Sequence, residues 1–144
     1  MAHLLELFGV NVGYHDPFAD VPGYTRLELD DLMGWRTSSC IAPRPKTAPR
    51  LLDLAASLMR PGSIILNIAR GGLIDEIALL GLLTAGHLAG AALDCFTKEP
   101  YDGPLKEMDN VILTPHIGSY AKEARIIMET DTIKNLLDVL FPGA

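Results

Sequence analysis

Short apolar segments alternate with helix-like segments from residue 38 onward, and this alternation restricts the possible folds more than any other feature. Apolar segments 38–43 and 63–67 are separated by helix-like residues 51–59, and segments 63–67 and 88–96 are separated by residues 75–85. Strands that alternate with helices pair through right-handed crossovers into a parallel sheet. The pattern therefore predicts an α/β fold with a doubly wound parallel sheet.

The individual segments predict the following elements. The paired isoleucines of segment 63–67 are typical of a strand that is buried on both faces. Residues 122–140 have the spacing of a long amphipathic helix, with Ile126, Ile127, Ile133, Leu136, Leu137 and Leu140 on its apolar side. We further expect a helix end at 1–8 stopped by Gly9, a strand at 10–15, a loop at 20–24, a helix at 27–34 and a strand at 110–113.

Composition narrows the class of partner. The chain has 144 residues, which is the size of one domain, and its 18 acidic and 12 basic residues give a net charge of −6. Because the basic residues are scattered, we expect no nucleic-acid or membrane partner and favour a small-molecule role. Cys40 and Cys95 lie in apolar segments, so we expect buried thiols and a cytoplasmic protein. Neither a signal peptide nor a membrane span is expected.

Polar residues follow three of the expected strands. They occupy residues 67–70, 94–99 and 114–116. In open parallel sheets, ligands bind beyond the carboxyl ends of the strands, because the connecting loops meet there. These three loops are therefore expected to converge on a single crevice.

Three side chains in these loops form a candidate acid–base site. His116 follows Pro115 on a stiff loop, and imidazole is the side chain whose pKa lies nearest to neutrality. A carboxylate bonded to its far nitrogen would fix the tautomer, and Glu99 is the candidate. Arg70 supplies a planar set of donors for a substrate carboxylate or for a carbonyl oxygen that gains negative charge.

Each of these residues has a structural alternative. Arg70 could cap the preceding helix or pair with Asp75, Glu99 could be a solvated loop charge, and His116 could be a structural or surface residue. Asp16 could accept hydrogen bonds from ribose hydroxyls, or Asp16-Pro17 could simply open a turn. The co-occurrence of three such groups at separate strand ends favours the acid–base site.

Two other kinds of chemistry are disfavoured. Cys95 and His116 could form a thiol–imidazole pair, but the charge of neighbouring Asp94 would raise the pKa of the thiol. The four histidines are far apart in sequence and lack metal-ligand spacing, so no metal site is expected.

Four segments together resemble the NAD-binding domain of the D-isomer-specific 2-hydroxyacid dehydrogenases. They are FGVNVGYHDPFAD, LMRPGSIILNIARGGLIDE, HLAGAALDCFTKEPYDGPL and MDNVILTPHIGSYAKEA, and they contain, in order, N-x-x-R-G-G, A-L-D-x-F-x-x-E-P and T-P-H-I-G. Nearly the whole chain takes part. The stretches KEPYDGPL and PHIGSYAKEAR are most similar to the phosphoglycerate dehydrogenase branch.

This resemblance implies roles for individual residues. Arg70 corresponds to the arginine that binds the substrate carboxylate and carbonyl, Glu99 to the acid that pairs with the histidine, and His116 to the acid–base. Asp16 corresponds to the acid that holds the adenosine ribose and favours NAD, and Asp94 to the residue that binds the nicotinamide carboxamide. The residues at positions that line the cofactor are Ile68, Ala69, Arg70, His116 and Gly118. The implied reaction is hydride transfer between NAD and a small D-2-hydroxy or 2-oxo acid such as D-3-phosphoglycerate.

The chain also departs from the family pattern. It has no G-x-G-x-x-G motif, which the family carries on a strand and helix that would precede residue 1. Near residues 38–43, Ile41 and Ala42 stand where the family usually has a histidine or threonine. We therefore expect residues 1–144 to be a partial, Rossmann-like NAD-binding domain that is truncated at its N-terminus, without most of the substrate domain. The first strand of the sheet would be missing.

These departures predict how the isolated chain behaves. We expect weak NAD binding, together with marginal stability, aggregation or a homodimer formed through an open sheet edge. A non-catalytic binding or dimerisation module derived from the same fold is the alternative to an enzyme.

Overall fold

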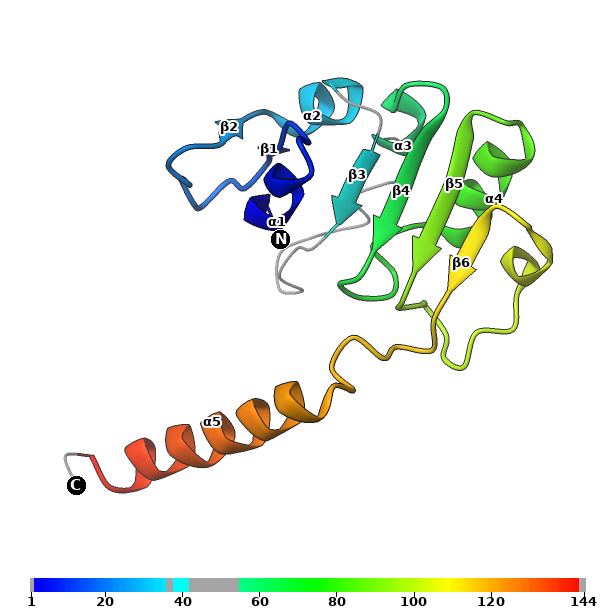
Figure 1. Cartoon of the computed structure of the whole chain (residues 1–144). Coiled ribbons are helices and arrows are strands. Elements are labelled where there is room, and N and C mark those ends of the chain that lie inside the picture. The colour runs from blue at the N-terminus through cyan, green and yellow to red at the C-terminus, as the bar shows by residue number, and fades with distance from the viewer. Residues whose placement is uncertain (1, 36–37, 42–54, 143–144) are drawn as a thin grey trace.

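A four-stranded parallel sheet forms the centre of the molecule (Figure 1). The computed structural model describes residues 2–35, 38–41 and 55–142. The strands are β3 (Ser38–Ile41), β4 (Ser63–Asn67), β5 (Leu88–Leu93) and β6 (Val111–Leu113), and they lie side by side in chain order. All three pairings are parallel, which confirms the α/β class and the parallel sheet.

Helix α4 (Glu76–Thr84) packs behind the sheet and follows β4 through the loop that carries Arg70. Asp75 caps it, because its carboxylate accepts hydrogen bonds from the backbone N–H groups of Ile77 and Ala78 at 2.8 and 3.1 Å. The helix ends near Gly86, whose φ of 70° suits a residue without a side chain. The expected helix over 75–85 is thus confirmed.

The two faces of the sheet differ in burial. On the face towards α4, Ile65 of β4 is fully buried and pairs with Ala91 of β5, which is also buried. On the opposite face, Ile64 is 43% exposed and Ile112 of β6 is 68% exposed. The expectation that β4 is buried on both faces is therefore wrong for the described residues, because no described helix covers the side of Ile64.

The hydrophobic core lies between the sheet, α4 and the loops that follow the strands. Its members are Met33, Met59, Ile65, Leu73, Ile74, Leu79, Leu83, Leu88, Ala91, Leu93, Phe96 and Leu105. Leu105 belongs to a short 3-10 helix, Pro104–Glu107, which the sequence patterns did not indicate. Phe96 stacks on Tyr101 with ring centroids 4.5 Å apart. The loop after β5 is thereby fixed to the core.

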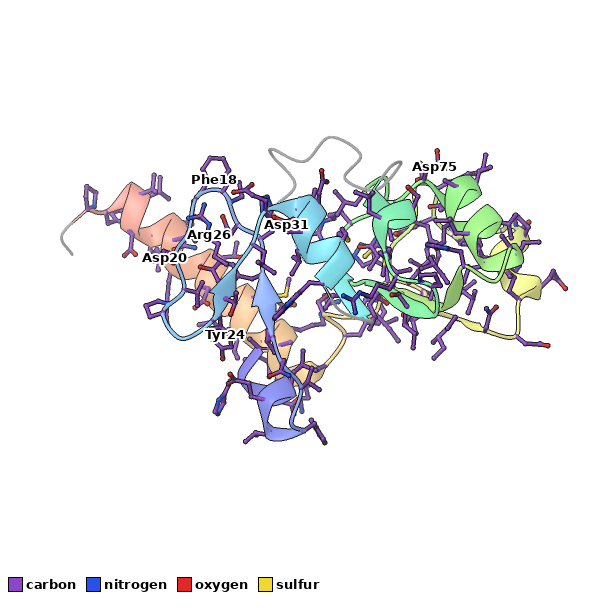
Figure 2. All side chains as sticks on the ribbon, turned by 90° about the horizontal axis from the view of Figure 1, so that it is seen from above. Phe18, Asp20, Tyr24, Arg26, Asp31 and Asp75 are labelled. Atoms are coloured by element: carbon purple, nitrogen blue, oxygen red, sulfur yellow. The ribbon has the colours of Figure 1, made fainter. Side chains whose placement is uncertain are left out.

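The N-terminal segment forms a separate small unit. Helix α1 (Ala2–Leu7) has the expected stop at Gly9, whose φ is 74°. The strand expected at 10–15 is only β1 (Gly13–Tyr14), which pairs in parallel with an unexpected β2 (Thr25–Arg26). Figure 2 shows Phe18, Asp20 and Arg26 on the outer side of this unit, far from Asp75 at the start of α4.

Two further helices flank these sheets. Helix α2 (Leu29–Trp35) confirms the helix expected at 27–34, and α3 (Ala55–Leu58) lies within the expected 51–59. Residues 42–54, which include the proline-rich connection, lie outside the described residues.

Helix α5 (Lys122–Leu140) has the bounds that the sequence predicts, but it contains no buried residue. Figure 1 shows it extending away from the four-stranded sheet. Its apolar side is open, with Ile126 at 53% and Leu136 at 56% exposure. Within the described residues, no helix is both long and apolar enough to cross a membrane.

Candidate active site

Three loops meet at the carboxyl edge of the sheet and line one surface pocket. The pocket is formed by Arg70, Gly71 and Gly72 after β4, by Phe96, Thr97 and Glu99 after β5, and by His116 after β6. The convergence expected from the three strand ends is therefore present in the structure. Arg70, Glu99 and His116 come from three separate loops and share this pocket.

Glu99 and His116 are joined by a hydrogen bond. The Nδ1 atom of His116 lies 2.9 Å from Oε2 and 3.1 Å from Oε1 of Glu99. The hydrogen bond to His116 lowers the pKa of the Glu99 carboxyl, and a second one from the Phe96 N–H lowers it further. An ionised carboxylate can only accept, so Nδ1 carries the proton and the Nε2 atom remains available for proton transfer.

The backbone of His116 adopts a conformation that is rare for a residue with a side chain. Its φ is 53°, in the left-handed region, which costs on the order of 1–3 kcal/mol for a non-glycine residue. The left-handed residue of this turn is His116 itself, whereas the nearby Gly118 has no positive φ. Such a conformation persists only where neighbouring groups hold it.

Asp94 supplies the groups that hold this turn. Its Oδ1 atom accepts hydrogen bonds from the Thr114 hydroxyl at 2.6 Å and from the Ile117 N–H at 2.9 Å. Its Oδ2 atom accepts one from the Gly118 N–H at 3.0 Å. Burial raises the pKa of Asp94, but these three hydrogen bonds and the neighbouring His116 outweigh burial and lower it. The sequence patterns did not indicate the contribution of Thr114.

Arg70 lies in a loop that a buried asparagine organises. The side chain of Asn67, which is 2% exposed, donates to the Arg70 carbonyl at 3.0 Å and accepts from the Ala69 N–H at 3.1 Å. The guanidinium of Arg70 donates to the Ala69 carbonyl and is exposed. It forms no ion pair with any described carboxylate, Asp75 included, so its charge is available to a ligand. The sequence places Asn67 among the polar residues at this strand end, but its role in ordering the Arg70 loop is seen only in the structure.

The remaining candidate residues lie at two places. Ile68 and Ala69 follow β4 directly, and Ile68 is 46% exposed. Asp16 follows β1 in the smaller sheet and does not line the pocket that Arg70, Glu99 and His116 share. Its Oδ1 atom accepts from the N–H groups of Phe18 and Ala19 at 2.8 and 3.1 Å, which is a turn of the kind that the Asp-Pro pair predicts.

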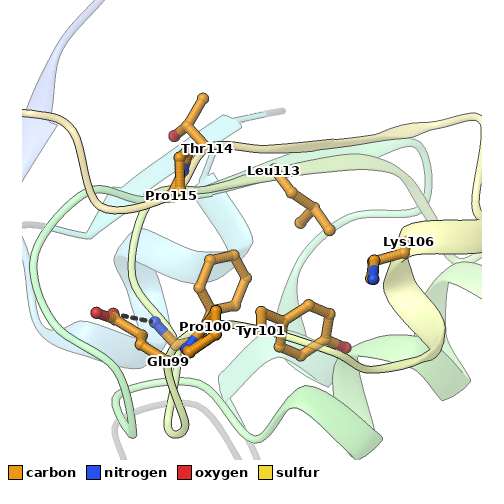
Figure 3. A pocket seen from close by; sticks show the side chains of 8 residues that line it. Glu99, Pro100, Tyr101, Lys106, Leu113, Thr114 and Pro115 are labelled. Atoms are coloured by element: carbon orange, nitrogen blue, oxygen red, sulfur yellow. Dashed lines mark hydrogen bonds between the residues drawn. The ribbon is translucent and has the colours of Figure 1, made fainter.

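A second pocket lies on the other side of Glu99. Phe96, Pro100, Tyr101, Leu113 and Pro115 give it apolar walls, together with Thr114 and Lys106. Figure 3 shows Glu99 at one end and Lys106 at the other. The Lys106 ammonium pairs with Asp102 at 2.8 Å. Because its cation is already paired, this pocket offers less to an anionic ligand than the Arg70 pocket.

The thiol and metal alternatives find no support in the described residues. Burial raises the pKa of the Cys95 thiol, and the charges of Asp94 and Glu99 raise it further while Arg70 lowers it. A thiol of raised pKa is protonated at neutral pH and is a weak nucleophile. In the part of the chain that the structure describes, no group of three or more His, Cys, Asp or Glu side chains could hold a metal ion.

A family model and individual relatives match this chain over most of its length. The family described as "D-isomer specific 2-hydroxyacid dehydrogenase, NAD binding domain" matches residues 1–118. The D-3-phosphoglycerate dehydrogenase of Mycobacterium tuberculosis is 37% identical over 144 residues, which cover 94% of this chain. The enzyme of the same name from Escherichia coli is 38% identical over 133 residues, or 85% of this chain.

Solved structures show the same fold. An NADPH-dependent glyoxylate/hydroxypyruvate reductase from Sinorhizobium meliloti superposes with a TM-score of 0.89 at 30% identity over 99% of this chain. A D-2-hydroxyisocaproate dehydrogenase gives 0.84 at 30% identity over 99%. The chain spans 27% of the length of the mycobacterial protein and 46% of the Sinorhizobium chain.

Proposed function

The chain belongs to the D-isomer-specific 2-hydroxyacid dehydrogenase family, and from this premise we propose that it takes part in an NAD-dependent oxidoreductase acting on a small D-2-hydroxy or 2-oxo acid. Residues 1–144 would be part of the NAD-binding domain of that enzyme. The supporting observation is the hydrogen-bonded Glu99–His116 pair beside the guanidinium of Arg70, which pairs with no carboxylate among the described residues. An acid–base and an anion-binding group next to each other suit a substrate that carries a carboxylate beside a carbonyl.

The described residues fit the nicotinamide part of such a cofactor. Ile68 is exposed at the carboxyl end of β4. Among the described residues only the Gly118 N–H donates to Oδ2 of Asp94, so this oxygen can accept another hydrogen bond from a carboxamide. Ile68, Ala69 and Gly118 would line the ring, and Asp94 would hold the carboxamide. The bound cofactor would supply or accept the hydride at carbon 2 of the acid. The sequence contains no glycine-rich phosphate loop, so the pyrophosphate has no matching cradle in this chain.

The protein groups would then act as follows. The Arg70 guanidinium would bind the substrate carboxylate and orient the carbonyl or hydroxyl group. His116 would donate a proton from Nε2 to the carbonyl oxygen during reduction, and would take the hydroxyl proton during oxidation. Glu99 would keep the ring in one orientation and stabilise the imidazolium form.

NAD and a phosphorylated three-carbon acid are the specific ligands that we propose. The Asp16 carboxylate at the end of β1 would accept hydrogen bonds from ribose hydroxyls and repel a 2′-phosphate, although the Sinorhizobium relative is NADPH-dependent. Relatives named D-3-phosphoglycerate dehydrogenase support the acid substrate. The alternative, a non-catalytic binding or dimerisation module, gains no support from these relatives.

We also propose a cytoplasmic homodimer. The buried free thiol of Cys95 suits a reducing compartment. The exposed apolar groups on the open face of the sheet, Ile64 and Ile112, suit burial against a second copy.

A segment exchange tests the proposed activity. The matching segment of the mycobacterial D-3-phosphoglycerate dehydrogenase is replaced by this chain, and NADH formation from D-3-phosphoglycerate is followed by absorbance. We expect His116→Asn and Arg70→Lys each to reduce kcat/KM by on the order of 100-fold. The matched controls His3→Asn and Arg125→Lys change exposed residues of the same types and should leave the rate unchanged. A folded exchange protein that binds NADH but has no activity, or a His116→Asn variant with full activity, would contradict the proposal.

A further inference from the structure

Glu76 reaches from the start of α4 to the turn that carries Glu99. Its Oε1 atom accepts a hydrogen bond from the Thr97 N–H at 2.7 Å, across a sequence separation of 21 residues. The adjacent N–H, that of Phe96, donates to Oε1 of Glu99 at 3.0 Å. Two consecutive peptide N–H groups are thus held by two different carboxylates. This turn can move only if one of these hydrogen bonds is broken.

Helix capping does not explain the position of Glu76. Asp75 already accepts the hydrogen bonds of the first free N–H groups, those of Ile77 and Ala78. A carboxylate in the first turn of a helix is favoured by the helix dipole wherever it points. The hydrogen bond to Thr97 therefore needs a separate explanation.

A close backbone contact joins the same two loops. A Cβ atom added to Gly71 would lie 1.8 Å from the Phe96 carbonyl oxygen and 2.7 Å from the Thr97 nitrogen. Only glycine permits this approach, so the loop that carries Arg70 lies directly against the turn that carries Glu99. Glu76 accepts a hydrogen bond from the N–H of the same peptide, which joins Phe96 to Thr97.

We propose that Glu76 is a positioning residue, which holds the Glu99 turn against the Arg70 loop and so fixes the Glu99–His116 pair relative to the guanidinium. This role in the reaction rests on the proposed function, whereas the coupling between Glu76 and Glu99 can be measured without it. Glu76 touches no reacting atom in this scheme and acts through the Thr97 peptide. Without it, the Phe96 N–H would no longer be aimed steadily at Glu99.

The test compares three variants of the 144-residue chain by NMR. Glu76→Ala removes the acceptor, Glu76→Gln keeps an oxygen that can accept from Thr97, and Glu123→Ala removes an exposed glutamate from the first turn of α5 as the matched control. Two quantities are measured, the exchange rate of the Thr97 amide and the pKa of the Glu99 carboxyl. The groups that act on this carboxyl are His116, the Phe96 N–H and Asp94.

The expected pattern is specific to the Glu76 acceptor. In Glu76→Ala, the Thr97 amide should exchange about tenfold faster, and the Glu99 pKa should rise towards its ordinary value of 4.5. Glu76→Gln should restore both quantities towards those of the native chain, and Glu123→Ala should change neither. An unchanged Glu99 pKa in a folded Glu76→Ala variant would overturn the proposal, as would a Glu76→Gln variant that behaves like Glu76→Ala.

One measurement on the native chain needs no variant. If the hydrogen bond is present, the Thr97 amide should exchange slowly with solvent although Thr97 is exposed, and exchange at the rate of an unbonded exposed amide would overturn the proposal. These results do not depend on enzymatic turnover. A segment-exchange protein without activity, combined with intact coupling between Glu76 and Glu99, would refute the proposed function but not the coupling.

Discussion

Residues 59–118 differ sharply from the segments on either side of them. Among the residues that the structure describes, eleven of the twelve core residues lie between Met59 and Leu105, and Met33 is the only one from the N-terminal segment. Helices α1 and α5 have no buried residue at all. The central region therefore carries almost all of the described hydrophobic core.

This difference divides the candidate site residues. Arg70, Glu99 and His116 lie in the packed central region, where buried side chains such as Asn67 and Asp94 fix their loops. Asp16 lies in the N-terminal unit, on a turn that its own carboxylate stabilises. The residues that we propose for the acid–base chemistry are thus held by core packing, whereas the residue that we propose for the ribose is held by its immediate neighbours.

The largest expected contrast comes from two glycine substitutions. Gly71→Ala would place a Cβ atom 1.8 Å from the Phe96 carbonyl oxygen, so two loops of the central region would have to separate. We expect a loss of more than about 4 kcal/mol in the free energy of unfolding. Gly9→Ala has open space around it and only its φ of 74° to overcome, which costs about 1–2 kcal/mol.

Urea denaturation of both glycine variants measures this contrast. Equal losses would show that the two sites tolerate an added side chain equally well, and would contradict the expected contrast.

A core truncation gives the next largest effect. Leu105 has no exposed surface, so Leu105→Ala should cost about 3 kcal/mol through lost burial and a residual cavity. Ile126→Ala on α5 removes a side chain that is 53% exposed and should cost less than about 0.5 kcal/mol. Thermal unfolding followed by circular dichroism would distinguish the two. A large effect of Ile126→Ala would show that α5 has a packing partner in solution.

The sequence predicted the central region well because local patterns and tertiary packing agree there. Segment 63–67 became β4 with the predicted bounds, and the helix expected over 75–85 is α4 with its caps. The meeting of Arg70, Glu99 and His116 in one pocket also followed from the strand ends. In a parallel sheet, chain order and crossover handedness place successive strand ends at the same edge.

The sequence failed where neighbours far along the chain decide the outcome. The strand expected at 10–15 shortened to two residues, and β2 appeared opposite it, because pairing and not local preference sets strand length. The left-handed turn at His116 depends on Asp94, 22 positions earlier, and the Glu99 turn depends on Glu76. No local pattern encodes contacts of this kind.

Acidification should weaken the central region selectively. The folded-state pKa values of Asp94 and Glu99 are lowered, so both carboxylates stabilise the folded state above their ordinary pKa values. This contribution is lost as the pH falls through the lowered folded-state values. The free energy of unfolding should therefore fall less between pH 7 and pH 3 in Asp94→Asn than in the native chain, with Asp138→Asn on α5 as the control for net charge. If Asp94→Asn has the same pH dependence as the native chain, the ionised Asp94 carboxylate does not stabilise the folded state.

The smallest effect on stability, and the most informative one, concerns the two faces of the sheet. Ile112 lies on the open face and is 68% exposed, so Ile112→Lys should change the free energy of unfolding by less than about 0.5 kcal/mol. If the open face is the contact surface of a dimer or an aggregate, the same change should still weaken self-association, because a charged side chain would have to be desolvated there. Light scattering coupled to size-exclusion chromatography measures this directly. A native chain that runs as a monodisperse monomer and melts cooperatively would show that the open face is tolerated in water without a partner.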